Sequence, residues 1–169
     1  MRILVLGGTT EASRLARALA ERSDIEATLS LAGRTEAPAA QPIPTRIGGF
    51  GGAAGLATYL REHRIDALVD ATHPFAAQIS RNAAEAARES ATPIVAYVRP
   101  PWTRGTADRW IEVGTLEEAA RAIGETPRRV LLTSGRLGLS SFSVAPQHHY
   151  LIRTIDHPGA LPGLPDHEL

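Results

Sequence analysis

The sequence of 169 residues contains no cysteine and no lysine, and only 5% of its residues are aromatic. Without cysteine the chain can form neither a disulfide framework nor a thiolate metal site, and it has no cysteine nucleophile. Without lysine it lacks the Walker motif of P-loop NTPases and the Tyr and Lys pair of short-chain reductases and epimerases. The motifs HExxH and GxSxG are also missing, which argues against a zinc protease and an esterase.

No excess of one charge is present, because 18 basic residues balance 18 acidic ones and no stretch concentrates one sign. Binding to nucleic acid or to an anionic membrane requires a basic surface, so we expect neither partner and predict a small-molecule ligand. The apolar run that opens the chain stops at two glycines and is too short for a signal peptide or a membrane span. We expect a cytoplasmic protein without a bound metal, either a monomer or a weak homodimer.

Short β-rich runs alternate with stretches of helical periodicity along residues 2–98. Tight turns between parallel strands imply right-handed crossovers and one sheet covered on both faces, so the fold class predicted is α/β, with a Rossmann-like doubly wound parallel sheet. The predicted strands are 2–6, 25–32, 45–47, 65–70 and 93–98, and the predicted helices are 11–23, 53–63 and 76–90.

A second unit is predicted after the segment RPPWTRGTADRW, whose prolines and glycine break the alternation at residues 99–110. We assign residues 1–108 to a dinucleotide-binding domain and residues 109–169 to the beginning of a second, smaller α/β domain. That unit has a helical stripe after Leu116, strands at 129–132 and 150–155, and a Pro/Gly-rich tail. Two or three strands are too few for an independent covered sheet, so we expect this domain to be incomplete.

The first candidate site is GGTTEA, residues 7–12, directly after the first strand. Two glycines let the backbone approach a pyrophosphate, and the N–H groups at a helix N-terminus attract it. The third glycine of the usual fingerprint is missing, and Glu11 adds a negative charge that we expect to meet a hydroxyl or an arginine. The alternative is a tight turn in which Glu11 only stabilises the helix N-terminus. The predicted cofactor residues here are Gly7, Gly8, Thr9, Thr10 and Glu11, with Thr9 or Thr10 as the helix cap.

The end of the second strand carries Ser30 and Arg34 and no acidic residue, since Glu26 lies at the strand's other end. In enzymes that use NAD, an acidic residue at this position accepts a hydrogen bond from the ribose 2′-hydroxyl, whereas an arginine accommodates the 2′-phosphate of NADP. Ser30 and Arg34 therefore favour NADPH as the cofactor. The alternative for Arg34 is an ordinary solvated loop residue.

Four glycines surround Phe50 after the third strand, and this is more glycine than a turn needs. We predict that the loop passes close to the cofactor and that Phe50 covers it; a flexible loop without a ligand is the alternative. The cofactor residues predicted here are Gly48, Gly49, Phe50 and Gly51.

The fourth strand ends at Asp70 and leads into ATHPFA, where Pro74 fixes the chain after His73. We predict that Thr72 and His73 contact the cofactor and that His73 is the catalytic candidate, as a general acid or a nicotinamide contact. The alternative is a structural histidine, with Thr72 capping the next helix. In the second unit, Arg136 and Arg153 are predicted to bind substrate carboxylates, with ordinary surface positions as the alternative.

Seven segments in this order resemble the precorrin-6A reductase family: LVLGGTTEASRLA, SLAGRT, IGGFGG, DATHPFAAQISRNAAEA, RPPW, DRWIEV and LLTSGR. DATHPFA is the most specific of them, and the resemblance covers the whole chain. It implies a cytoplasmic oxidoreductase of cobalamin (corrin) biosynthesis that uses NADPH to reduce one double bond of a tetrapyrrole, precorrin-6A or its cobalt form, giving precorrin-6B.

Members of this family have two Rossmann-like units with the cofactor and the macrocycle between them, and they are longer than this chain. The resemblance therefore also implies that part of the second domain is missing here. His73 is the candidate proton donor by position, and water is its rival. The alternatives are a noncatalytic NADP(H)-binding module and an inactive, shortened reductase.

Overall fold

A computed structural model describes the chain except for residues 34–38, 156, 162 and 165. The chain divides into two compact units, Met1–Pro101 and Trp102–Leu169. This division falls after Pro101, while the sequence prediction set the domain boundary after residue 108. Each unit is described by itself.

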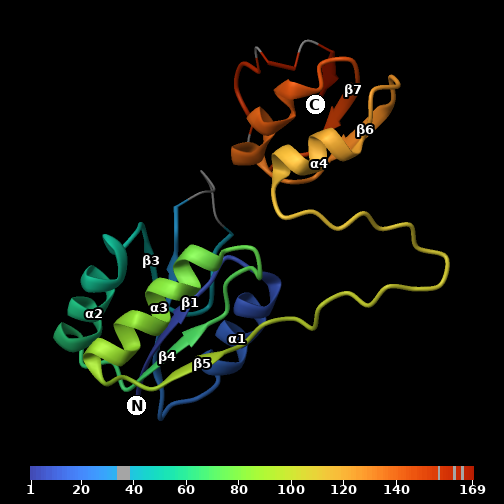
Figure 1. Cartoon of the computed structure of the whole chain (residues 1–169). Helices are drawn as coiled ribbons and strands as arrows, with labels where there is room; N and C mark the ends of the chain where they lie inside the picture. Colours follow the sequence, from blue (N-terminus) through green and yellow to red (C-terminus); the bar gives the residue numbers. More distant parts are fainter. Residues whose placement is uncertain (34–38, 156, 162, 165) are drawn as a thin grey trace. The chain divides into compact units, whose positions relative to one another are not determined.

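The first unit is built on a sheet of five strands in the order β3-β2-β1-β4-β5, and every neighbouring pair is parallel (Figure 1). The chain adds two strands on one side of β1 and then crosses to its other side, so the strand order reverses between β1 and β4. This confirms the predicted doubly wound, Rossmann-like fold. The strands are β1 (Arg2–Leu6), β2 (Glu26–Leu31), β3 (Thr45–Ile47), β4 (Ala67–Asp70) and β5 (Ile94–Ala96).

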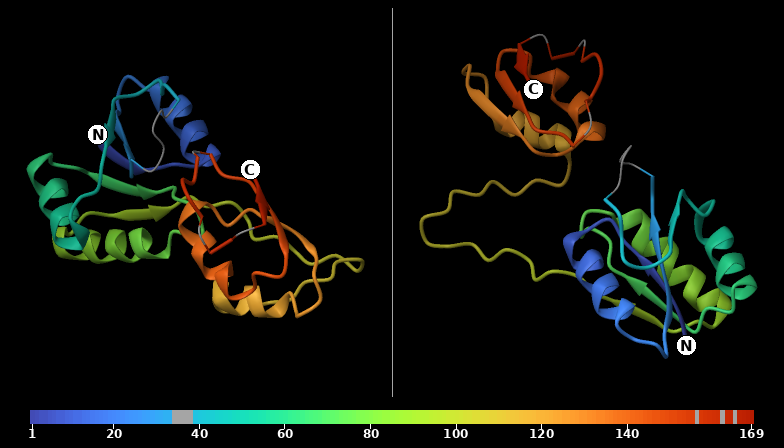
Figure 2. Two further views of the ribbon diagram at one scale, coloured as in Figure 1. Left: turned by 90° about the horizontal axis from the view of Figure 1, so that it is seen from above. Right: turned by 180° about the vertical axis from the view of Figure 1, so that it is seen from behind.

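Helices cover both faces of this sheet, as the views in Figures 1 and 2 show. The helix α1 (Thr10–Ala20) lies on one face, and α2 (Gly52–Glu62) and α3 (Ala77–Ser90) lie together on the other. The observed ends lie close to those predicted. α3 stops where Ala91 takes a left-handed conformation with φ 55°, just before the proline at position 93.

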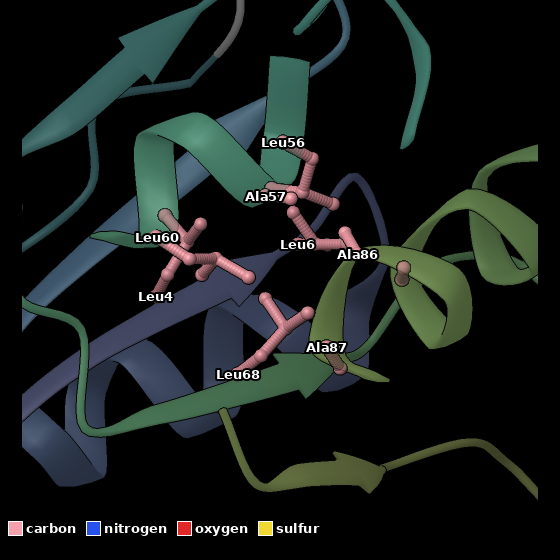
Figure 3. Packing of buried hydrophobic residues seen from close by; sticks show 9 residues of the cluster. Leu4, Leu6, Leu56, Ala57, Leu60, Leu68, Ala86 and Ala87 are labelled. Atoms are coloured by element: carbon pink, nitrogen blue, oxygen red, sulfur yellow. The ribbon is translucent and has the colours of Figure 1, made fainter. Parts of the chain in front are cut away.

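Alternation along β1 divides the core between the two faces, because successive side chains of a strand point to opposite sides. Leu4 and Leu6 pack with α2 and α3, whereas Ile3 and Val5 pack with α1 and β2. Figure 3 shows the first cluster, in which leucines of β1, α2 and β4 point toward one another and against the alanines of α3. The buried residues of that cluster are Leu4, Leu6, Leu56, Ala57, Leu60, Leu68, Ala83, Ala86 and Ala87.

The second unit contains a smaller parallel sheet in the order β6-β7-β8, together with one α-helix and a 3-10 helix. Its elements are α4 (Leu116–Ala122), β6 (Arg129–Leu132), η1 (Arg136–Val144), β7 (His149–Ile152) and β8 (His167–Glu168). It has its own buried cluster, in which the hydroxyl of Tyr150 donates to the carbonyl of Ala145 at 2.7 Å.

The second unit differs from the sequence prediction at two places. The strand predicted at 150–155 runs from His149 to Ile152, and the Pro/Gly-rich tail contains β8, a strand that was not predicted. The two-residue β8 is too short to show a periodic pattern, and its pairing with β7 is what makes it a strand. No helix in the described part of the chain combines the length and the apolar character needed to cross a membrane.

Candidate functional site

The loops that follow β1 and β4 are joined by the side chain of Thr9. Its hydroxyl donates to the carbonyl of Ala71 at 2.8 Å and accepts from the backbone N–H of Ala12 at 3.1 Å. Thr9 is therefore the N-cap of α1, as predicted, and it also connects the two strands between which the strand order reverses. In open α/β sheets ligands bind outside the carboxyl ends of the strands at such a point.

The two glycines of the β1–α1 turn serve different purposes. A Cβ at Gly7 would lie 2.6 Å from Cδ1 of Leu29, so this glycine lets the turn pack against β2. Gly8 has a φ of +112°, which favours glycine, and a Cβ there would meet nothing within 4 Å. Gly8 thus presents backbone to open space beside the N-terminus of α1.

Glu11, the acidic residue of this turn, is paired with Arg99, which follows β5. Nη2 of Arg99 donates to Oε2 of Glu11 at 3.0 Å. A hydrogen bond from the backbone N–H of Glu11 and the nearby guanidinium hold the pKa of this carboxyl below its usual value, against the effect of partial burial. The expected arginine partner of Glu11 is present, and the residue also lies in the first turn of α1. Arg99 was not predicted as a site residue. The only feature of the sequence that could have indicated it is its position just beyond a predicted strand.

The Glu11→Gln variant is expected to be less sensitive to acid than the wild type. Because the folded state lowers the pKa of Glu11, its carboxylate stabilises the fold above the unfolded pKa, about 4.3 for glutamate. This contribution is lost as the pH falls through the lowered folded pKa. Urea unfolding at several pH values between about 2.5 and 7 measures the effect. Glu21→Gln, at the exposed end of the same helix, is the control, and a Glu11→Gln curve parallel to the wild type would contradict the expectation.

Arg46 of β3 organises the ends of β2 and β3. Its Nη1 donates to the hydroxyl of buried Ser30 at 2.8 Å and to the carbonyl of Gly48 at 2.9 Å, and its Nη2 donates to the carbonyl of Gly49 at 3.2 Å. Its guanidinium carbon lies 3.8 Å from the ring centroid of Phe50. Four predicted cofactor residues are thus in contact with one arginine that the sequence reasoning missed, because a lone arginine in a short strand carries no signal.

The glycine loop, residues 48–52, leads from β3 into α2. A Cβ at Gly48, Gly49 or Gly51 would meet nothing within 4 Å. Phe50 is half-buried between Arg46 and Tyr59, whose ring stands edge-on at 5.2 Å. The loop's open side is therefore backbone, while its aromatic ring packs against the body of the unit. Arg34, the other residue predicted at the end of β2, lies outside the described residues.

The loop after β4 places His73 on the surface. Asp70 is buried and accepts from the N–H of Thr72 at 3.1 Å and from its hydroxyl at 2.6 Å. Thr72 therefore does not cap α3, and that alternative was wrong: the N-cap is Ala76, and it makes no side-chain cap bond. Nδ1 of His73 accepts from the N–H of Phe75 at 3.2 Å, so in the neutral ring the proton is on Nε2.

The two predicted substrate arginines belong to the second unit and are both exposed. Arg136 begins η1 and lines a mainly apolar hollow of about 260 Å³. Arg153 was predicted to lie on the last strand, but it follows the end of β7, and β8 is the last strand. Within the described ranges, no group of three or more histidine or carboxylate side chains could hold a metal ion.

The fold and the arrangement of its loops define a Rossmann-like α/β protein with a glycine turn at the point where the strand order reverses. The chain belongs to the precorrin-6x reductase family: residues 2–169 match the family described as "Precorrin-6x reductase CbiJ/CobK". This confirms the family resemblance carried by the sequence motifs.

Two curated relatives illustrate the range of similarity. A precorrin-6A reductase of Rhodobacter capsulatus is 55% identical over 166 residues, which cover 98% of this chain and 65% of the relative. A cobalt-precorrin-6A reductase of Priestia megaterium is 33% identical over 142 residues, covering 83% of this chain and 55% of the relative.

A solved structure of a CobK precorrin-6A reductase superposes with a TM-score of 0.94 at 52% identity, over 99% of this chain and 66% of that one. The chain thus spans 65% of the length of the Rhodobacter capsulatus relative and 66% of the solved structure.

Proposed function

We propose that the chain is the cofactor-binding part of an oxidoreductase that uses NADPH to reduce a double bond of precorrin-6A, or of its cobalt form, to give precorrin-6B. The observation that carries the proposal is the Thr9 bridge, which joins the loops after β1 and β4 where the strand order reverses. The family membership supplies the substrate class, since relatives are named precorrin-6A and cobalt-precorrin-6A reductases.

The residues at this edge of the sheet suit a dinucleotide. Gly8, Gly48, Gly49 and Gly51 all follow strand ends, and a Cβ on any of them would meet open space. Backbone that is free of side chains can approach a phosphate or an adenosine closely. The carboxylate of Glu11 would repel a diphosphate, and its pairing with Arg99 offsets that charge.

The protein's own contribution to the reaction is binding and orientation. A reduced nicotinamide supplies a hydride when it is bound. In our proposal, the β1–α1 turn with Gly7, Gly8, Thr9, Thr10 and Glu11 holds the diphosphate, Ser30 and Arg34 select the 2′-phosphate, and the glycine loop lies along the adenosine.

We assign His73 to the nicotinamide end of the site. Because its Nδ1 accepts from Phe75, its Nε2–H is the group that can donate to a ligand. Proton donation to the macrocycle would require the imidazolium form, which would lose the Phe75 bond. Arg136 and Arg153 are proposed to bind substrate carboxylates from the second unit.

The Arg34→Ala variant is expected to bind NADPH about 10–100-fold more weakly and NADH about as well as the wild type, because a charge-assisted hydrogen bond contributes about 1.5–3 kcal/mol. Titration followed by nicotinamide fluorescence measures both affinities. Arg17→Ala, an exposed arginine near the end of α1, is the matched control.

Three outcomes of that titration are informative. Selective loss of NADPH affinity in Arg34→Ala supports the proposed site and justifies an assay of the chain with precorrin-6A. Equal affinities for NADPH and NADH in the wild type would contradict the choice of cofactor. Tight NADPH binding without any reduction of precorrin-6A would favour a noncatalytic binding module.

A further inference from the structure

We infer that Arg46 is a positioning residue of the cofactor site, which holds the glycine loop in the shape that receives the adenosine end of the dinucleotide. The inference rests on the proposed function and adds a residue that acts through the loop and does not contact the ligand. Arg46 lies on β3, directly before the loop, and its backbone register pairs it with Ser30 of β2.

Arg46 holds the first half of the loop by hydrogen bonds to the loop itself and to β2. A guanidinium can only donate hydrogen bonds, so its partners must be acceptors. Here the acceptors are the Ser30 hydroxyl and the carbonyls of Gly48 and Gly49. The loop's start is also tied to β2 by the N–H of Gly48, which donates to the carbonyl of Leu31 at 2.9 Å. The carbonyls of Gly48 and Gly49 are therefore both held by the Arg46 guanidinium.

The second half of the loop is held through Phe50. The Arg46 guanidinium stacks on the Phe50 ring at 3.8 Å and lies 5.3 Å from the Tyr59 ring of α2. Gly55 lets the carbonyl of Phe50 approach α2, since a Cβ at that position would overlap the carbonyl oxygen. Arg46 therefore links β2, β3, the loop and α2 in one contact set, and the loop's glycines are left with their open side free.

These contacts argue for positioning and against a direct contact with the 2′-phosphate. Three of the five N–H donors of Arg46 are used within the described part of the chain, and one face of its guanidinium is covered by Phe50. A loop that lies along adenosine serves NADPH and NADH equally, because both contain that group. Loss of Arg46 should thus weaken both cofactors by the same factor.

The test compares Arg46→Lys and Arg46→Met with the wild type. Lysine keeps the charge but not the planar fork, and methionine keeps much of the apolar contact with Phe50. Hydrogen exchange of the amides of residues 48–52, measured without cofactor, reports the loop directly. Titration with NADPH and with NADH reports the site, and Arg61→Lys and Arg61→Met, which alter the exposed ion pair of α2 with Glu89, are the controls.

We expect exchange of the loop amides to rise about tenfold or more in both variants, and both affinities to fall about tenfold, as loss of one or two hydrogen bonds would produce. Unchanged exchange would overturn the inference whatever the affinities are. Selective loss of NADPH would replace it with a role at the 2′-phosphate, either by direct contact or through the hydroxyl of Ser30, to which Arg46 donates. If variants with a loosened loop bind both cofactors like the wild type, only this inference fails, whereas a wild type that binds neither cofactor overturns the proposed function and the inference together.

Discussion

The Leu68→Ala variant is expected to lower the free energy of unfolding of the first unit by about 2–5 kcal/mol, because it removes buried methyl groups and leaves a cavity. Leu68 of β4 is fully buried. It points into the cluster shared by β1, α2 and α3, as Figure 3 shows. Its neighbours come from three elements whose backbones are held by other contacts, so they cannot move in to fill the space.

Urea unfolding followed by circular dichroism measures this loss, and exchange of the Leu4 and Leu6 amides assigns it to the first unit. Leu131→Ala is the control, since Leu131 of β6 is 59% exposed. The control is expected to change stability by no more than about 0.5 kcal/mol. A loss below about 1 kcal/mol in Leu68→Ala would show that the cluster is less closely packed than the structure indicates.

The Thr9→Val variant is expected to cost about 2–4 kcal/mol of stability and to weaken NADPH binding. Valine has a similar shape but no hydroxyl, so α1 loses its cap, which is worth about 0.5–2 kcal/mol. The carbonyl of Ala71 loses its donor as well, and an unsatisfied buried group costs about 1–3 kcal/mol. Both losses occur at the point where the loops of β1 and β4 meet, so the cofactor site should loosen with them.

Thr9→Ser tests whether the hydroxyl or the methyl group of Thr9 is responsible for the loss of the helix cap and of the bond to Ala71. Serine restores the hydroxyl and should recover most of the stability and of the affinity. Thr58→Val makes the same change on the exposed face of α2 and should be nearly neutral. If Thr9→Ser were as damaging as Thr9→Val, the methyl group of Thr9 would be the important part, and the bridge to Ala71 would not explain the site.

Much of the fold could be predicted because its signals are local. β1, β3 and β6 have the predicted bounds, and the apolar stripes of α1, α2 and α3 are the faces that they bury. Periodicity reports which side of an element is buried, and glycine and proline report where the element ends. The same locality explains what was missed: β8 depends on its partner β7, and Thr72 bonds Asp70 at the end of β4, whereas a cap of α3 had been the alternative.

The sequence by itself determined the doubly wound class, the glycine turn after β1 and the motifs that place the chain in its family. Only the tertiary structure decided which side chains pair with, or hydrogen-bond to, the residues of those motifs. Arg99 reaches Glu11 from the segment after β5, and Arg46 reaches Ser30 from β3, because parallel strands bring their carboxyl ends to one edge regardless of their separation along the chain. Such partners share no spacing or period with the motif that they support, and so they become visible only when the sheet is formed.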